Sequence, residues 1–259
     1  MSPLPMTGLP VNPRFLVETI HLSFTFSRLI ILAMTLGEDF PQLADLGYWD
    51  NRYTESLKDG QPHEWYRSFD DLEEFFKRFL FHTYSAESDP RILHLGSGES
   101  TVPQDLARQH GYRNQLCVDF STVVITMMTY RHADIHGIRW QQMDVRQMDR
   151  IPSHSIDVAF DKGTLDSMIH GSPWTPPPDV VDSTGRYMRE LTRVLKPTGT
   201  FICVTFRQPH FVRPLLNCEG TNWDINVETL GGLDSSFGYY GFKCTLVVTR
   251  NVDNDVNEC

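Results

Sequence analysis

Two glycines and two aspartates stand where a chain could hold a nucleoside. Gly96 and Gly98 lie between a β-rich run and a helical stretch, so a ligand could approach the backbone and the helix N-terminus there. Asp119 ends the next β-rich run, where a carboxylate can accept both ribose hydroxyls of an adenosine; capping of the following helix is the alternative. Asp144, after a third run, can take the adenine amino group while Val145 offers a backbone amide.

The residues after the glycine turn favour a sulfonium cofactor over a pyrophosphate. A dinucleotide fingerprint would have a third glycine near Thr101, whereas this chain has Glu99 and Ser100 in that turn. A bulky acidic side chain disfavours a bound pyrophosphate and tolerates a cation. The turn therefore predicts S-adenosyl-L-methionine as the cofactor.

The elements that must position these residues alternate from residue 89 onward. Strands are expected over 91–95, 114–119, 138–143, 155–160 and 200–206, with helices over 101–110, 121–130 and 182–195. Two further β-rich runs, 223–230 and 242–250, have no helix between them and predict a hairpin. The predicted fold class is α/β: a Rossmann-like seven-stranded methyltransferase sheet, mostly parallel with an antiparallel C-terminal hairpin, and helices on both faces. A dehydrogenase would instead add a sixth parallel strand.

Composition and charge limit the domain count and the partners. The 259 residues, 40% of them apolar, predict one methyltransferase domain over 41–250, with a poorly structured N-terminal extension over 1–40 and an acidic tail over 251–259. The formal net charge of -10 disfavours nucleic acid and suits a basic protein segment or a small molecule. Since no stretch has the roughly 18 to 20 apolar residues of a membrane span, no membrane association is expected. No oligomeric state follows from the sequence.

The cysteines and histidines predict neither disulfides nor a metal. Five cysteines are spread without a CxxC pair, which is typical of free thiols in a reducing compartment, and we expect a cytoplasmic protein. His132 and His136 have the i,i+4 spacing of a zinc helix, but no Glu or third ligand accompanies them. No metal site is therefore expected.

Four segments carry a resemblance to a known family. They are Phe160-Asp161-Lys162-Gly163-Thr164-Leu165-Asp166, Tyr48-Trp49-Asp50-Asn51-Arg52-Tyr53, Glu64-Trp65-Tyr66 and Leu191-Thr192-Arg193-Val194-Leu195-Lys196-Pro197. With them the chain resembles the elongation factor 1-alpha lysine methyltransferases, including the N-terminal half of methyltransferase-like 13 proteins. The similarity runs from about Gly47 to Phe211; the first and last 40 residues match poorly.

The resemblance implies a set of cofactor contacts. Carried over position by position, they are Trp49, Tyr53, Trp65, Gly96, Asp119, Phe120, Asp144, Val145 and Lys162. Aromatic rings from the N-terminal segment can face a sulfonium by cation–π attraction and exclude water, although ordinary core packing is the alternative for Trp49, Tyr53 and Trp65. Ser97 replaces the family's usual cysteine between the glycines.

The resemblance also implies a reaction, namely methylation of a lysine on a translation elongation factor. A lysine acceptor must first lose a proton, and Asp161 and Asp166 flank the expected reaction centre as candidates for acceptor positioning or proton removal. Loop capping is the equally weighted alternative for both. The absence of an Asn-Pro-Pro-Tyr motif after the fourth strand disfavours amide and adenine acceptors. Trp174 is a candidate for an acceptor-side wall, or else part of a surface loop.

Two other function classes stay open. A small-molecule methyltransferase would keep the cofactor half and differ in segments 173–182, 210–222 and 230–240. A non-catalytic binding protein would keep the fold and lose cofactor affinity.

Overall fold

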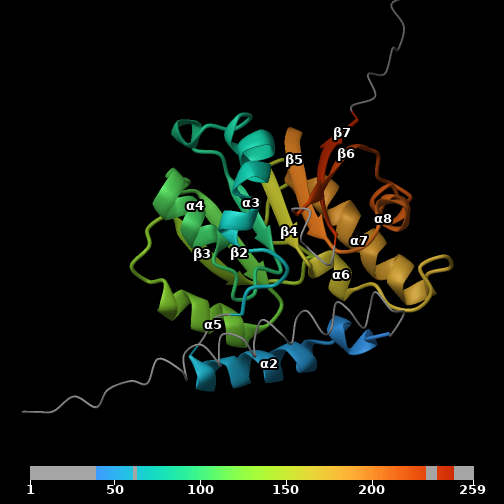
Figure 1. Cartoon of the computed structure of the whole chain (residues 1–259), viewed down its shortest axis with the longest axis horizontal. Coiled ribbons are helices and arrows are strands. Elements are labelled where there is room, and N and C mark those ends of the chain that lie inside the picture. Colours follow the sequence, from blue (N-terminus) through green and yellow to red (C-terminus); the bar gives the residue numbers. More distant parts are fainter. Residues whose placement is uncertain (1–38, 61–62, 232–237, 248–259) are drawn as a thin grey trace, which may run out of the picture. The chain divides into compact units, whose positions relative to one another are not determined.

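The computed structural model describes residues 39–60, 63–231 and 238–247 (Figure 1). The predicted N-terminal extension, 1–40, falls outside the described residues except for its last two positions. The predicted acidic tail, 251–259, lies outside them entirely.

The strands of the described residues form one seven-stranded sheet in the order β3-β2-β1-β4-β5-β7-β6. They are β1 (Ile92–Leu95), β2 (Gln115–Asp119), β3 (Ile138–Gln142), β4 (Ile156–Lys162), β5 (Leu195–Thr205), β6 (Trp223–Leu230) and β7 (Tyr239–Leu246). The first five pair in parallel, whereas β7 runs antiparallel to both β5 and β6. The predicted fold class is confirmed.

Helices flank this sheet on both sides (Figure 1). The α-helices are α2 (Leu46–Asp59), α3 (Phe69–Phe76), α4 (Val102–His110), α5 (Thr122–Arg131), α6 (Thr164–Ser167), α7 (Pro178–Val194) and α8 (Pro209–Leu216). Shorter turns are η1 (Pro41–Ala44), the π-helical η2 (Lys77–Phe81) and η3 (Ala86–Ser88).

Alternate side chains of the central strands pack against different helices. Leu93 of β1 belongs to the core cluster that contains Leu191 of α7. His94, the next residue, faces Phe160 of β4, whose ring contacts Phe76 of α3. Since α7 and α3 therefore cover opposite faces, the strands are buried on both sides and read as continuous apolar runs.

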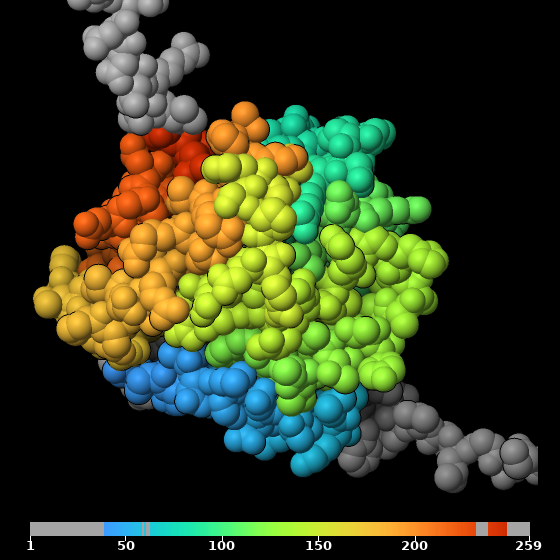
Figure 2. Space-filling model, turned by 180° about the vertical axis from the view of Figure 1, so that it is seen from behind, coloured from blue at the N-terminus to red at the C-terminus, as the bar shows by residue number. Residues whose placement is uncertain are grey.

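Helix α2 packs against α5. The buried ring of Tyr53 joins Val124 and Met128 of α5 in one hydrophobic cluster. In Figure 2 the blue surface of the N-terminal described segment adjoins the green surface of α5. This packing brings the aromatic segment to the edge of the sheet where β1 and β2 end.

Local sequence signals account for the helix ends. Ser121 caps α5, where its Oγ accepts a hydrogen bond from the Val124 amide. Gly111 ends α4 in the left-handed region, with φ +77°. Ser68 and Asp71 form a reciprocal capping box at α3.

Several elements differ from the predicted ones, and α2, α3 and α6 were not predicted. Helix α7 begins at Pro178 rather than Asp182, because a proline is tolerated in the first turn. Strand β5 begins at Leu195, five residues before the predicted start at Thr200. The register of β5 with β4 shifts across residues 196–199. Helix α8 was not predicted, since its internal Pro214 obscures the helical pattern.

Several absences hold for the described part of the chain only. None of its helices has the length and apolar character needed to cross a bilayer. It contains no group of three or more His, Cys, Asp or Glu side chains suited to a metal ion. Its cysteines are free thiols: Cys117, Cys203, Cys218 and Cys244.

Candidate cofactor site

The turn after β1 contains glycines because its backbone is in the left-handed region and the Thr164 side chain packs closely against it. Gly96 and Gly98 have φ of +55° and +50°. A Cβ at Gly96 would lie 2.1 Å from Thr164 Oγ1, and this hydroxyl donates a 2.8 Å hydrogen bond to the Leu95 carbonyl. The turn after β1 therefore rests directly against the turn after β4.

Asp119, the last residue of β2, presents a buried carboxylate to this glycine turn. The residue is 3% exposed, and its Oδ2 accepts a 3.1 Å hydrogen bond from the Gly98 amide. Its Oδ1 accepts one of 2.9 Å from the Ser121 amide. Burial raises the pKa of Asp119 to about 6, although the two amide donors lower it. The group is thus a carboxylate above pH 6, suited to hydroxyl donors such as those of a ribose.

Ser97, between the glycines, carries a buried Oγ that has no hydrogen-bond partner among the described residues. A buried hydroxyl without a partner costs free energy unless a ligand or water satisfies it. Together with the Asp119 carboxylate, it gives the turn both a donor and acceptors. The residues present therefore fit an adenosyl ligand.

Asp144 lies at the same edge of the sheet as Asp119 but is already engaged. The Met143 amide donates a 2.8 Å hydrogen bond to the Asp119 carbonyl, which joins the two strand ends. The Asp144 carboxylate accepts from Arg146 Nε at 2.9 Å and Nη2 at 2.7 Å. Burial alone would raise the pKa of Asp144, but the hydrogen bonds from Arg146 lower it. Its predicted contact with an adenine amino group stays a prediction, in which the adenine would share this carboxylate with Arg146.

The two neighbours of these aspartates have ordinary structural contacts. The Phe120 carbonyl accepts a 3.1 Å hydrogen bond from Gln142 Nε2. Val145 is 5% exposed and belongs to the main core cluster. The predicted contacts of Phe120 and Val145 with the cofactor stay predictions.

The predicted aromatic contacts gather beside the glycine turn. Trp49 lies 5.7 Å, between ring centroids, from both Tyr53 and Trp65. The Tyr53 hydroxyl lies 3.1 Å from where a Cβ of Gly98 would be. The structure thus brings the aromatic segment to the turn near Asp119, as the sequence predicts, while its role as a cofactor contact stays a prediction.

Lys162, the last residue of β4, holds a segment that we call the strap, residues 63–67. Its side chain is 4% exposed, and its Nζ donates to the Trp65 carbonyl at 2.7 Å and to a Glu64 carboxylate oxygen. The other Glu64 oxygen accepts a 2.7 Å hydrogen bond from the Thr101 amide. Its ammonium thus connects the strap to β4. The predicted contact of Lys162 with the cofactor stays a prediction.

Asp161, one of the two predicted catalytic residues, is fully buried and satisfied by donors around it. Its carboxylate accepts from the Thr164 amide at 2.9 Å, the Leu165 amide at 3.0 Å and the Tyr187 hydroxyl at 2.7 Å. Burial raises its pKa to about 7, although the Tyr187 hydrogen bond lowers it. These contacts are those of the capping alternative, because they hold the start of α6.

Asp166, the second predicted catalytic residue, faces the strap. It is 2% exposed, and its two oxygens accept from the Tyr66 hydroxyl at 2.9 Å and the Thr205 hydroxyl at 2.6 Å. Arg207 Nε lies 3.4 Å away. Burial raises the pKa of Asp166, although Arg207 opposes this rise. Tyr66 and Glu64 were not among the predicted site residues, although both stand in the Glu64-Trp65-Tyr66 segment that carries the resemblance.

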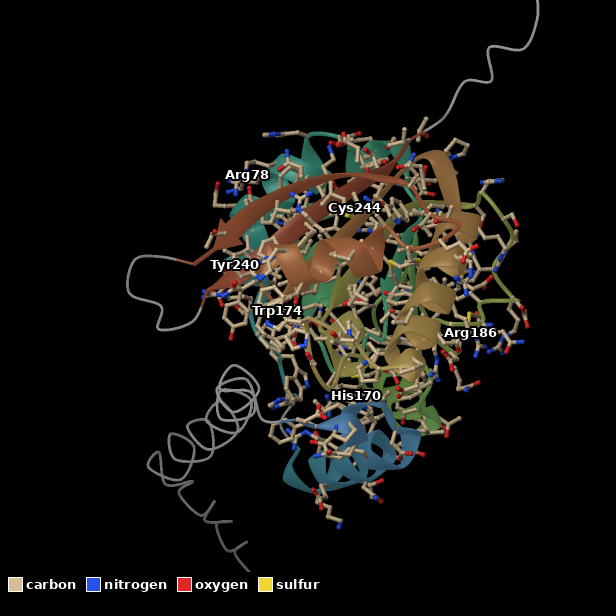
Figure 3. All side chains as sticks on the ribbon, turned by 90° about the vertical axis from the view of Figure 1, so that its right-hand side faces the viewer. Arg78, His170, Trp174, Arg186, Tyr240 and Cys244 are labelled. Atoms are coloured by element: carbon tan, nitrogen blue, oxygen red, sulfur yellow. The ribbon has the colours of Figure 1, made fainter. Side chains whose placement is uncertain are left out.

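Trp174, labelled in Figure 3, lies in the loop between α6 and α7. It is 78% exposed, and its ring contacts Phe211 of α8 at 4.9 Å between centroids. This loop and α8 follow β4 and β5 respectively, so the tryptophan lies at the rim of the same sheet edge as Asp166.

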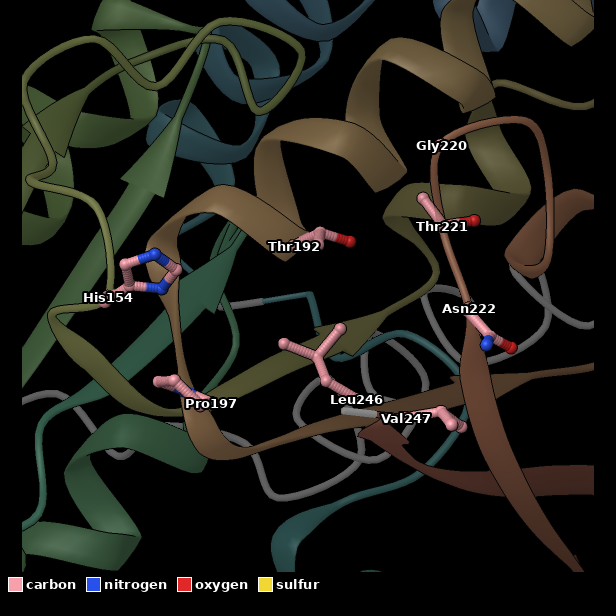
Figure 4. Close-up of a pocket in the computed structure, with 8 residues that line it drawn as sticks. All are labelled: His154, Thr192, Pro197, Gly220, Thr221, Asn222, Leu246 and Val247. Carbon is pink, nitrogen blue, oxygen red and sulfur yellow. The ribbon is translucent and has the colours of Figure 1, made fainter. Parts of the chain in front are cut away.

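A separate pocket of about 460 Å³ opens at the other end of the strands (Figure 4). Its lining includes Pro197 at the start of β5 and Leu246 at the end of β7. It is therefore remote from the glycine turn, Asp119 and the strap, which lie where β1, β2 and β4 end.

The chain is similar to known methyltransferases in sequence and in fold. Residues 93–203 match the methyltransferase domain family. The EEF1A lysine methyltransferase 4 of Bos taurus is 36% identical over 189 residues, 72% of this chain and 71% of that protein. Its Mus musculus counterpart is 37% identical over 172 residues, 66% of this chain and 64% of the relative's length. A SAM-dependent methyltransferase from Aquifex aeolicus superposes with a TM-score of 0.52 and 14% identity, covering 75% of this chain and 98% of that one.

Proposed function

Since this chain belongs to the EEF1A lysine methyltransferase family of S-adenosylmethionine-dependent enzymes, we propose that it methylates a lysine side chain of an elongation factor 1-alpha-like protein. The resemblance of the β4 motif and the names of the relatives support this acceptor. The net charge of -10 adds to it, because an acidic enzyme attracts a basic protein segment.

One observation carries the cofactor half of the proposal: the buried Asp119 carboxylate bonded to the Gly98 amide. In this arrangement Asp119 would hold the ribose hydroxyls of an adenosyl group that lies against the glycine turn. Ser97 would satisfy its hydroxyl on the same ligand. When bound, S-adenosylmethionine supplies an electrophilic methyl group on a sulfonium.

The remaining residues of the site would align the acceptor and exclude water. Methyl transfer is an in-line displacement, so its rate depends mainly on the orientation of the nucleophile. The cluster of Trp49, Tyr53 and Trp65 provides an apolar wall for that purpose. A lysine acceptor reaches this centre as an ammonium and must release a proton before it can react.

Two measurements test the proposed function. S-adenosylhomocysteine is titrated into the purified protein by calorimetry, and binding in the micromolar range is expected; no heat of binding would remove the cofactor assignment. The protein is then incubated with methyl-labelled cofactor and either purified elongation factor 1-alpha or a cell lysate. Label on a lysine of the elongation factor supports the proposal, whereas label found only in low-mass products contradicts it.

We also propose a cytoplasmic location. The free thiols Cys117, Cys203, Cys218 and Cys244 are typical of a reducing compartment, which supports this location. Fractionation of cells that express the tagged full-length chain tests it, and recovery in an organelle fraction would contradict it.

A further inference from the structure

Tyr66, in the middle of the strap, has a backbone conformation that its side chain disfavours. Its φ is +63°, in the left-handed region that a bulky aromatic residue rarely adopts. Such a conformation is unfavourable and persists only where the surroundings impose it. The strap is fixed on both sides: Lys162 donates to the Trp65 carbonyl at 2.7 Å, and Arg67 Nη2 donates to the Leu230 carbonyl at 3.2 Å.

This conformation places the Tyr66 hydroxyl at the turn after β4. A Cβ at Gly163 would lie 3.2 to 3.3 Å from the Tyr66 ring edge and hydroxyl. The next residue, Thr164, bonds the Leu95 carbonyl just before the Gly96 turn. Tyr66 therefore lies where the turns after β1 and β4 meet, beside the glycine turn against which the proposed function places the adenosyl group.

The direction of the Tyr66 hydrogen bond leaves its oxygen able to accept another one. The hydroxyl proton is donated to Asp166 Oδ2 at 2.9 Å. Asp166 is itself fixed by the Thr205 hydroxyl at 2.6 Å, with Arg207 Nε 3.4 Å away. A hydroxyl that donates to a carboxylate is a stronger acceptor through its own lone pairs, and these can receive an N–H group.

Aromatic rings pack around the Tyr66 ring. The Tyr66 ring lies 5.4 Å from Tyr239, 5.9 Å from Phe206 and 6.2 Å from Trp65, between centroids. Aromatic faces attract an alkylammonium and accommodate an aliphatic stem. The Arg67 and Arg207 guanidinium groups already lie over the Tyr239 and Phe206 rings, 4.8 and 5.1 Å from their centroids. The aromatic surface around Tyr66 therefore suits the aliphatic stem of a lysine side chain.

We propose that the Tyr66 hydroxyl accepts a hydrogen bond from the amine of the acceptor lysine, and that Asp166 is the positioning residue that orients this hydroxyl. The inference rests on the proposed function and identifies how that site recognises an amine. The acceptor ammonium first releases one proton to solvent. The nitrogen lone pair then forms the N–C bond while the S–C bond breaks and its electron pair stays on sulfur, giving a methylammonium. Tyr66 keeps its proton throughout and points the amine at the methyl carbon.

The test compares Tyr66→Phe with a control that loses a different buried tyrosine hydroxyl. Tyr112 is 3% exposed, and its hydroxyl donates to the Tyr84 carbonyl at 2.7 Å, before β2 begins. With purified elongation factor 1-alpha as acceptor, Tyr66→Phe is expected to lower kcat roughly tenfold to hundredfold, since it removes one hydrogen bond to the reacting group. Its affinity for S-adenosylhomocysteine stays within about twofold of the wild type. Tyr112→Phe keeps the wild-type kcat.

Asp166→Asn tests the positioning role separately. If Asp166 acts through Tyr66, the double variant Tyr66→Phe/Asp166→Asn has the kcat of Tyr66→Phe alone. Losses in kcat that multiply in the double variant would contradict this coupling. A wild-type kcat in Tyr66→Phe would overturn the inference even if Asp166→Asn does not fold.

The failure of the inference differs from the failure of the proposed function. If the wild type leaves the elongation factor unlabelled, the proposed acceptor is wrong. The wild type and Tyr66→Phe are then compared on a lysate protein that the wild type does label. Weaker labelling by Tyr66→Phe there supports the inference, and equal labelling overturns it. Label attached to an oxygen or carbon atom, or no labelling by the wild type at all, overturns it as well.

Discussion

Lys162 Nζ donates a 2.7 Å hydrogen bond to the main-chain carbonyl of Trp65 and also pairs with the Glu64 carboxylate. This cation is nearly buried, so its charge is compensated mainly by the strap. Glu64 in turn accepts from the Thr101 amide at the start of α4. One ion pair thereby links the strap, the glycine turn and the end of β4, and it determines where Trp65 and Tyr66 lie.

The first prediction concerns that ion pair. Lys162→Met leaves the Glu64 carboxylate without its cation and is expected to lower the free energy of unfolding by about 3 kcal/mol, as for other buried pairs broken on one side. The double variant Glu64→Gln/Lys162→Met should recover part of this loss, because no uncompensated charge remains. Urea unfolding of both single variants and the double variant gives the coupling energy.

The control for this cycle is the exposed pair of Lys77 and Glu74. Lys77→Met is expected to unfold at the same urea concentration as the wild type, because exposed pairs contribute little. If Lys162→Met also unfolded like the wild type, the strap would not depend on this cation. If Lys162→Met lost cofactor affinity while Glu64→Gln kept it, Lys162 would be a direct cofactor contact instead.

The second prediction concerns the closeness of the two turns. Gly96→Ala places a Cβ 2.1 Å from Thr164 Oγ1 and requires a left-handed alanine, which together should lower the free energy of unfolding by about 3 kcal/mol and abolish S-adenosylhomocysteine binding. Gly60 is a matched control, since its φ is +69° but, its chain neighbours aside, no atom of the described residues lies within 4 Å of its Cβ position. Gly60→Ala should lose only about 1 kcal/mol and keep full binding. Equal losses of unfolding free energy in the two variants would mean that contact with Thr164 does not constrain the glycine turn.

Much of the fold could be predicted because the parallel strands are buried on both faces. Apolar runs around Leu93, Leu116 and Ala159 are continuous, so the central strands were predicted to within one or two residues. Helix α8 escaped prediction because Pro214 stands inside it, where tertiary packing of Val212 and Leu216 overrides a local preference.

The candidate site was only partly predictable, because its members pair across long stretches of chain. Gly96 and Asp119 were predicted from strand ends, a local signal. The partners of Lys162 and Asp166 stand 98 and 100 residues earlier, at Glu64 and Tyr66. No spacing rule indicates such pairs. The resemblance alone implied a role for Lys162, as a cofactor contact, and the role of Asp166 was left open between chemistry and capping.

The third prediction follows from the pKa of Asp119, which burial raises to about 6. Above this pH the group is ionised and can accept both ribose hydroxyls; below it, protonation removes an acceptor. The affinity for S-adenosylhomocysteine should therefore be constant from pH 7 to 8 and fall up to about tenfold per pH unit below 6. In Asp119→Asn the affinity at pH 7.5 should be about tenfold weaker and the dependence on pH between 5 and 7 absent. Calorimetry across this range measures both, and an unchanged pH profile in the variant would assign the titration to another group.

The last prediction concerns Trp174 as part of an acceptor-side wall. Its ring is 78% exposed and rests on Phe211 at the rim of the sheet edge, so Trp174→Ala should leave the free energy of unfolding within about 0.5 kcal/mol of the wild type. If the ring contacts a protein acceptor, KM for elongation factor 1-alpha should rise roughly tenfold, since large exposed aromatics contribute strongly to interfaces. Affinity for S-adenosylhomocysteine should not change.

Tyr130 on α5 provides the matched control, because it is 80% exposed and lies outside the rim formed by the loops after β4 and β5. Tyr130→Ala removes a similar aromatic surface and should keep the wild-type KM. A KM that rises equally in both variants would indicate a general loss of surface attraction. A KM unchanged in Trp174→Ala would mean that this tryptophan belongs to a surface loop with no part in acceptor binding, and that the protein acceptor is held by other residues of the rim.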